Sequence, residues 1–249
     1  MDQILGKKVL FLNPNNVMRN ELIDVLITYE FEVALAKDHV HALRVIKKYP
    51  DAILFINIDS GLSEPEWESY VAGILGNEET KGVGIGILSY EFVPEIAEKY
   101  LMKLGVGCGF VQLKLGLKES VTIILKALLA NEARGRRRFV RAICTPEDQG
   151  TLNFRYRGDY INGSLIDVSA GGVACSFDRN IDLPVGAPIN DIQLKLGPAL
   201  SKVSGKLAGY QNADKSRFVV VLNKNVNTRE RHKIQQFVHR HIQREIDSV

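Results

Sequence analysis

The stretch AILFINID, residues 52–59, decides the fold class expected for the first half of the chain. Its apolar residues follow one another without alternation, as in a strand that is buried on both faces of a parallel sheet. Strand-like and helix-like segments alternate around it, in five pairs between Val9 and Asn131. This alternation predicts an α/β domain over residues 1–131, a five-stranded parallel sheet covered by helices.

Apolar runs and helical spacing place the elements of this domain. The expected strands are Val9–Leu12, Phe31–Ala36, Ala52–Ile58, Val83–Ser89 and Gly109–Leu113. The expected helices are one capped by Asn16, one around Ala42–Ile46, and three over Pro65–Leu75, Pro94–Leu104 and Lys118–Asn131.

Residues 132–249 have a different pattern, because short strands follow one another with turn residues and no helices between them. The expected strands are Phe139–Cys144, Thr151–Arg157, Tyr160–Asp167, Gly172–Phe177, Pro188–Leu196, Val203–Tyr210 and Phe218–Leu222. This spacing is typical of an all-β antiparallel barrel or sandwich. A helix over Asn227–Glu245, with Thr228 as its expected N-cap, closes the chain.

Charge separates the two halves. Residues 1–131 carry 13 Lys/Arg and 17 Asp/Glu, whereas residues 132–249 carry 19 and 12. Five of the positive charges fall within Arg134–Arg141. A basic half with such a dense arginine cluster indicates an anionic partner for that half.

Several function classes find no support in the sequence. Cys108, Cys144 and Cys175 are widely spaced, which argues against a disulfide framework or a CxxC metal site and favours the reducing cytoplasm. No signal-peptide pattern or bilayer-length apolar run is present. The histidines lack an HExxH spacing, and no nucleophile–base pattern can be built. We therefore expect no metal, no cofactor, no catalytic residue and no membrane span.

Two short segments carry the chemistry of an anion-binding site. The first is Arg136-Arg137-Arg138-Phe139-Val140-Arg141, whose guanidinium groups can pair phosphates, grip a guanine edge at O6 and N7, or lie flat on a base. The second is Asp167-Val168-Ser169-Ala170-Gly171-Gly172, with a carboxylate that can accept from a guanine edge and glycines that permit close approach. This mixture suits an anionic, guanine-containing nucleotide.

These segments resemble the PilZ family of cyclic di-GMP receptors, whose marks are RxxxR followed by (D/N)xSxxG. Here they read Arg137-x-x-x-Arg141 and Asp167-x-Ser169-x-x-Gly172, and the resemblance extends to the end of the chain. It implies an antiparallel barrel that binds cyclic di-GMP on its outer face, in a bacterial effector of motility or surface behaviour. Signalling would proceed through a change in interdomain or partner docking, and the protein partner is left open.

The resemblance also assigns roles to residues. It implies that Arg137 and Arg141 hold phosphate and guanine, that Asp167 and Ser169 read other guanine edges, and that the glycines Gly171 and Gly172 permit close contact. Arg136, just before the motif, could stack on a second nucleotide, so one or two ligand molecules per chain are expected.

The first half is similar to the receiver domain of two-component response regulators. Such domains use acids after the first strand, a phosphoaccepting Asp after the third, a Ser/Thr after the fourth and a Lys after the fifth. Ser89 and Lys114 match, but Asn13, Asn15 and Asn16 follow the first strand and Asn57 lies nearest the acceptor position. Asparagine neither accepts a stable phosphoryl group nor supplies charge to Mg²⁺. We expect a pseudo-receiver, with Asp59 as the remaining acceptor candidate.

Two other functions remain as alternatives. The arginine cluster could bind a nucleic-acid backbone, but only Phe139 interrupts it and no stacking ladder accompanies it, so nucleic acid is the less favoured partner. The other alternative is a response regulator driven by phosphorylation, for which Asp59 would be required.

Overall fold

The computed structural model describes residues 5–14, 21–211 and 216–249. The chain forms two compact units: unit 1 contains residues 1–137 and 242–249, and unit 2 contains residues 138–241. This division describes compactness, and a domain boundary after Asn131 remains a prediction. The expected cap at Asn16 lies outside the described residues, as does Asn15.

Unit 1 is built on a five-stranded parallel sheet in the order β2-β1-β3-β4-β5. The strands are β1 (Lys8–Leu12), β2 (Glu32–Ala36), β3 (Ile53–Asn57), β4 (Gly84–Ser89) and β5 (Phe110–Gln112). All five residues of β3 are buried, as the continuous apolar run predicts. The α/β prediction is confirmed, and β2 forms one edge of the sheet.

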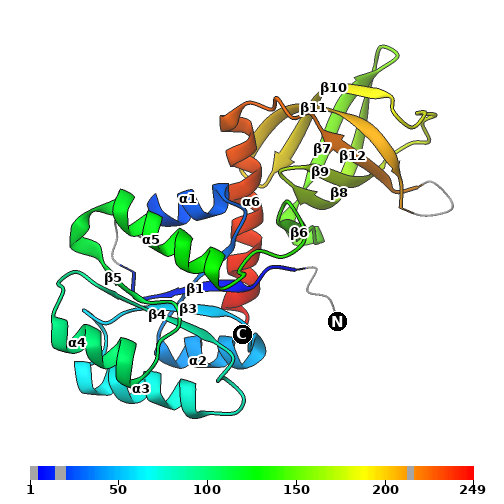
Figure 1. The fold of residues 1–249 in the computed structure, drawn as a ribbon. Helices are drawn as coiled ribbons and strands as arrows, with labels where there is room; N and C mark the ends of the chain where they lie inside the picture. The colour runs from blue at the N-terminus through cyan, green and yellow to red at the C-terminus, as the bar shows by residue number, and fades with distance from the viewer. Residues whose placement is uncertain (1–4, 15–20, 212–215) are drawn as a thin grey trace. The chain divides into compact units, whose positions relative to one another are not determined.

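Helices cover both faces of this sheet (Figure 1). In the figure, α1 (Ile23–Thr28) and α5 (Leu117–Ala130) cover one face, and α2 (His39–Lys48), α3 (Glu64–Gly76) and α4 (Pro94–Glu98) cover the other. Phe11 and Phe55 stack at 5.2 Å between ring centroids, in a core cluster that includes Leu26 and Ile124. Burying such aliphatic and aromatic side chains stabilises each by about 1.5–3 kcal/mol.

Unit 2 is an antiparallel barrel, which confirms the predicted all-β architecture. Strands β8, β7, β10, β11, β12 and β9 pair in that order, and a β8–β9 pairing closes the ring (Figure 1). The strands are β6 (Arg141–Ile143), β7 (Thr151–Tyr156), β8 (Asp159–Ser169), β9 (Gly172–Phe177), β10 (Pro188–Leu196), β11 (Ala199–Tyr210) and β12 (Phe218–Leu222). The short strand β6 pairs with the end of β8.

Helix α6 (Thr228–Asp247) contributes to both units. Ile234, Phe237 and Val238 are buried in its unit 2 part. The expected N-cap was wrong by one residue, because Asn227 Oδ1 accepts a 2.8 Å hydrogen bond from the Arg229 amide. The side chain before the first helical residue reaches the free amides of the first turn, and Thr228 already lies in the helix.

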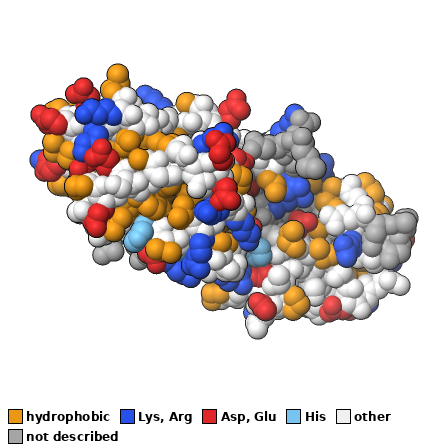
Figure 2. Space-filling model, turned by 90° about the horizontal axis from the view of Figure 1, so that it is seen from below, with side chains coloured by type: hydrophobic (Ala, Val, Ile, Leu, Met, Phe, Trp, Pro, Cys, Tyr) orange, Lys and Arg blue, Asp and Glu red, His pale blue; other side chains and the backbone are white. Residues whose placement is uncertain are grey.

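The surface is mixed in character. On the face drawn in Figure 2, Lys and Arg side chains are interspersed with Asp, Glu and hydrophobic side chains. Across the described ranges, no helix combines the length and the apolar character that crossing a bilayer requires.

Candidate functional site

The ring of Phe139 joins the two motifs within unit 2. A Cβ atom at Gly171 would lie 2.2 Å from Cδ2 of Phe139, so the ring rests directly on this glycine. Arg138 lies on the same ring, with its guanidinium carbon 5.2 Å from the ring centroid. The segment before β6 is therefore anchored on the Asp167–Gly172 loop by an aromatic–backbone contact.

Arg141 and Asp167 lie side by side on strands β6 and β8. Arg141 pairs with Ser169 and Ile143 with Asp167 in the strand register. Arg141 Nη1 lies 4.0 Å from Asp167 Oδ1, and 47% of the arginine side chain and 18% of the aspartate side chain are exposed. Such a pair contributes little to stability, since exposed ion pairs typically give 0–1 kcal/mol. Both groups stay accessible enough to contact a ligand.

The Ser169 hydroxyl makes its hydrogen bonds within its own loop. Its hydroxyl donates to the Gly172 carbonyl at 3.0 Å and accepts from the Gly172 amide at 3.2 Å. The serine is buried, with 4% of its surface exposed. In this structure Ser169 holds the β8–β9 turn closed, which is a positioning role, and its role as a direct ligand contact remains a prediction.

Gly172 is required by packing as well as by any ligand. A Cβ atom there would lie 2.7 Å from the carbonyl oxygen of Val220, because β12 passes close beside β9. The motif glycines Gly171 and Gly172 thus both accommodate this chain's own neighbouring groups. A closely approaching ligand is a second use that the same lack of side chains permits.

Two of the predicted site residues precede the barrel in the sequence. Arg136 and Arg137 end the first section of unit 1, and Arg141 lies in unit 2. Four residues of chain reach at most about 14 Å, so Arg137 is tethered close to Arg141 whatever the conformation between them. Just upstream, Arg134 donates to the Tyr29 carbonyl at 2.7 Å and lies 5.1 Å from the Phe31 ring, within unit 1.

Phe139 is the residue that motif reading overlooked. In the sequence it is a single aromatic residue inside an arginine cluster, and the sequence does not indicate which residue it contacts. Its one signal is chemical: a phenylalanine among arginines in a short polar segment needs an apolar or backbone surface to lie on. The structure supplies that surface as Gly171.

The carboxyl edge of the unit 1 sheet is closed by its own side chains. Asp59 Oδ1 accepts from the Ser89 hydroxyl at 2.7 Å and Oδ2 accepts from the Tyr90 amide at 2.6 Å. Asn57, which is buried, donates to the Asn13 carbonyl at 3.0 Å and accepts from the Asp59 amide at 3.1 Å. The only carboxylate among these polar groups is already engaged by hydrogen-bond donors.

The lysine expected at this edge is directed elsewhere. Lys114 Nζ pairs with Glu91 at 3.0 Å, and this hydrogen bond, with the attraction of the same carboxylate, raises the pKa of Lys114. Among the described residues no group of three or more His, Cys, Asp or Glu side chains is placed to hold a metal ion. In this arrangement the Asp59 carboxylate is hydrogen-bonded by Ser89 and the Tyr90 amide, and Lys114 is paired with Glu91.

Comparison of the chain with protein-family models and with curated proteins gives no match. Solved structures give partial matches. The chain is similar over 46% of its length to the PilZ domain with c-di-GMP of YcgR from Escherichia coli, at 16% identity and a TM-score of 0.39, and the match covers 99% of that chain.

Two further solved structures also match part of the chain. The MrkH–c-di-GMP complex of K. pneumonia matches over 43% of this chain and 52% of its own, at 16% identity and a TM-score of 0.36. The Mn(2+)-bound form of response regulator Rcp1 matches over 49% of this chain and 91% of its own, at 14% identity and a TM-score of 0.40. At such identities and scores, ligand binding has to be judged from this chain's own residues.

Proposed function

We propose that the protein is a non-enzymatic receptor for cyclic di-GMP, with its site at Arg137, Arg141 and the Asp167–Gly172 loop. The observation that carries the proposal is the contact of Phe139 with Gly171, which joins two motifs that lie far apart in the sequence. Arg141 and Asp167, both within unit 2, lie 4.0 Å apart, and their side chains are partly exposed.

The chemistry of the pair Arg141–Asp167 fits a guanine nucleotide. A guanidinium can bind phosphate oxygens through two hydrogen bonds or the O6/N7 edge of guanine. A carboxylate can accept from the N1–H and 2-amino groups of the same base. A bare phosphate would gain nothing from Asp167, and a cation would be repelled by the arginines. A phosphodiester carrying guanine uses both groups.

Signal output is proposed to be a change in docking, between parts of this chain or with a protein partner. The division between the units falls at Arg137, inside the RxxxR motif. A ligand held by both Arg137 and Arg141 would restrict the chain between these two residues. Control of motility or surface behaviour in a bacterium is the physiological setting that the family resemblance suggests.

Isothermal titration calorimetry of the full chain with cyclic di-GMP tests the proposal. We expect saturable binding that weakens with salt, because two phosphates meet arginine side chains. Arg141→Ala should lose at least about tenfold in affinity, as expected from loss of charge-assisted hydrogen bonds. Arg155→Ala, an exposed arginine on β7, is the matched control. Absence of binding, or equal losses in both variants, would refute the proposed site.

Stoichiometry tests the role of Arg136. If this arginine holds a second, stacked nucleotide, the wild-type chain binds two molecules and Arg136→Ala binds one. If the wild-type chain binds one molecule and Arg136→Ala leaves that affinity unchanged, Arg136 has no part in the site. Duplex DNA should not displace the nucleotide, and efficient displacement would favour the nucleic-acid alternative.

A further inference from the structure

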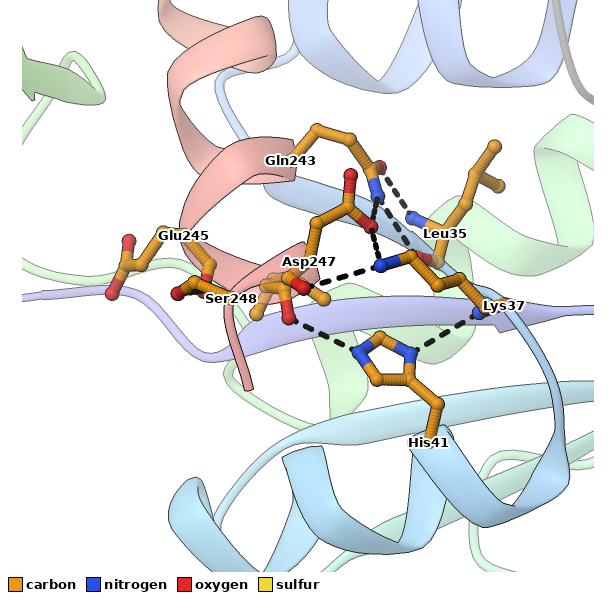
Figure 3. Close-up of polar contacts among 8 residues, drawn as sticks. Leu35, Lys37, His41, Gln243, Glu245, Asp247 and Ser248 are labelled. Carbon is orange, nitrogen blue, oxygen red and sulfur yellow. Dashed lines mark hydrogen bonds and ion pairs between the residues drawn. The ribbon is translucent and has the colours of Figure 1, made fainter.

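The last eight residues of the chain, 242–249, pack within unit 1 against the edge strand β2. Gln243 makes the central contact: its Oε1 accepts from the Leu35 amide at 2.8 Å and its Nε2 donates to the Leu35 carbonyl at 3.0 Å (Figure 3). One side-chain amide thus satisfies both backbone groups of an edge residue, as a neighbouring strand would do. We call residues 242–249 the C-terminal clamp.

His41 holds the end of the clamp. Its Nδ1 accepts from the Lys37 amide at 3.2 Å, which leaves Nε2 as the nitrogen that donates to the Ile246 carbonyl at 3.1 Å (Figure 3). Lys37 Nζ donates to the Asp247 carbonyl at 3.2 Å. Two of the last carbonyls of α6 are therefore bound by side chains of unit 1, and the Ile246 carbonyl also accepts from the Val249 amide at 3.1 Å.

Apolar burial and an ion-pair cluster complete the clamp. Ile242 and Ile246, one helical turn apart, are 3% and 0% exposed. Glu245 accepts from Tyr49 Oη at 2.7 Å and from Lys8 Nζ at 3.1 Å, and Lys8 also pairs with Glu32. Burial lowers the pKa of Lys8, but attraction to Glu32 and Glu245 outweighs it and the pKa is raised. These contacts involve several different side chains, which makes the packing of residues 242–249 on unit 1 specific.

The residue before the clamp lies near the segment that follows the arginine motif. His241 Nδ1 lies 3.7 Å from Asp148 Oδ2, within unit 2. Asp148 has a fully buried side chain and forms a capping box with Thr145. Its carboxylate accepts from the Thr145 amide at 2.6 Å and from the Thr145 hydroxyl at 3.0 Å. Thr145 follows β6 closely, and the first residue of β6 is Arg141.

We propose that nucleotide binding stabilises the packing of the C-terminal clamp on β2, and that α6 transmits this effect from the Asp148–His241 contact. The inference rests on the proposed function. Ligand held by Arg141 orders β6 and the Thr145–Asp148 turn, and the ordered turn fixes His241. Residues 241 and 242 are consecutive in one continuous α-helix, so order at His241 extends cooperatively into the clamp. The clamp closes more firmly on β2 when nucleotide is bound.

Amide hydrogen exchange of the full chain tests this proposal. The Leu35 amide is the probe, because it donates its hydrogen bond to Gln243 of the clamp. We expect saturating cyclic di-GMP to slow Leu35 exchange at least about threefold. His241→Ala should keep nucleotide binding and lose this slowing. Gln236→Ala, on the same helix but away from the clamp, should keep both.

Calorimetry on the same samples separates two kinds of failure. If cyclic di-GMP gives no heat, the proposed function fails. If it binds but Leu35 exchange is unchanged or faster, the function stands and the clamp inference is overturned. The inference is also overturned if His241→Ala binds nucleotide and still shows the full slowing.

A second variant tests the clamp directly. Gln243→Glu retains an acceptor for the Leu35 amide but loses the donor for the Leu35 carbonyl. The new carboxylate repels that carbonyl oxygen. We expect faster Leu35 exchange in this variant without nucleotide, with the far-ultraviolet circular dichroism of the wild type. Unchanged exchange at Leu35 would show that Gln243 does not hold the edge strand.

Discussion

Phe139 covers Gly171 so closely that no side chain fits at position 171. The 2.2 Å separation between a Cβ atom there and Cδ2 of the ring is far inside van der Waals contact. This relationship explains why a phenylalanine stands within an arginine cluster: its ring packs against the loop that carries Asp167. It also makes the geometry of the site depend on a contact outside both charged groups.

Gly171→Ala should destabilise unit 2 by about 1–3 kcal/mol, because overpacking forces the ring or the backbone to move. Urea unfolding followed by fluorescence or circular dichroism measures the loss. Gly73→Ala is the matched control, since nothing lies within 4 Å of a Cβ atom there and residue 73 lies inside α3. That control should be neutral or more stable by about 0.5–1 kcal/mol.

A double-mutant cycle identifies the cause. In a Phe139→Ala background, Gly171→Ala should cost much less than in the wild type, because the clashing ring is gone. If the cost is the same in both backgrounds, the Phe139 contact is not its source.

Acetyl phosphate or another small phosphodonor should not modify the chain. Asp59 already accepts hydrogen bonds from Ser89 and the Tyr90 amide, and the expected lysine pairs with Glu91. Intact-mass measurement with Mg²⁺ present checks this, and a mass gain that Asp59→Asn abolishes would establish phosphorylation. Asp59→Asn should itself cost about 1 kcal/mol, since a neutral amide oxygen accepts more weakly than a carboxylate.

Thiol reactivity should concentrate on Cys144. Burial raises the pKa of Cys108 to about 11, and burial together with the nearby charge of Asp167 raises the pKa of Cys175 to about 12. Only the thiolate reacts, so at pH 8 both residues should be nearly inert in the folded protein. A disulfide reagent followed by mass spectrometry should label Cys144 first, and Cys144→Ser should remove the fast phase. Rapid labelling of Cys175 would contradict its burial.

Glu230 should make unit 2 sensitive to acid. Burial raises the pKa of its carboxyl, but hydrogen bonds from Lys233 and from the Lys202 amide outweigh burial and leave the pKa lowered. A lowered folded-state pKa stabilises the folded state above the unfolded value of about 4.3, and this contribution is lost as the pH falls below it.

Denaturant unfolding of Glu230→Gln at several pH values measures this effect. We expect the variant to be about 1 kcal/mol less stable than the wild type at pH 7, with the difference shrinking below about pH 4. Glu147→Gln, an exposed glutamate in the same unit, should show no such pH-dependent difference. A gap that stays constant down to pH 3 would mean that Glu230 charge does not stabilise the fold.

Much of the architecture follows from local patterns in the sequence. The unbroken apolar run at residues 53–56 required burial on both faces, and β3 is the central strand of the parallel sheet. The short, regularly spaced strands after Arg141 required antiparallel pairing, and they close a barrel. These patterns suffice because strand and helix periods are properties of neighbouring residues.

The candidate site also combines features that the sequence indicates with features that only the structure shows. Residue types indicated the segments Arg136–Arg141 and Asp167–Gly172 as groups for an anionic guanine nucleotide, and the resemblance to the PilZ motifs singled out Arg137, Arg141 and Asp167. The role of Ser169 in closing its own turn, the engagement of Asp59 by Ser89, and the shift of the helix cap to Asn227 appear only with distances.

Local patterns in the sequence predict the two fold types, and the sequence also contains the arginine cluster and the asparagines at receiver-like positions. The packing of Phe139 on Gly171 and the pairing of Gln243 with Leu35 are apparent only from the three-dimensional structure. The physical reason is separation along the chain: 32 residues divide the first pair and 208 the second. Contacts between such distant residues depend on how whole strands and helices pack, and no local periodicity encodes them.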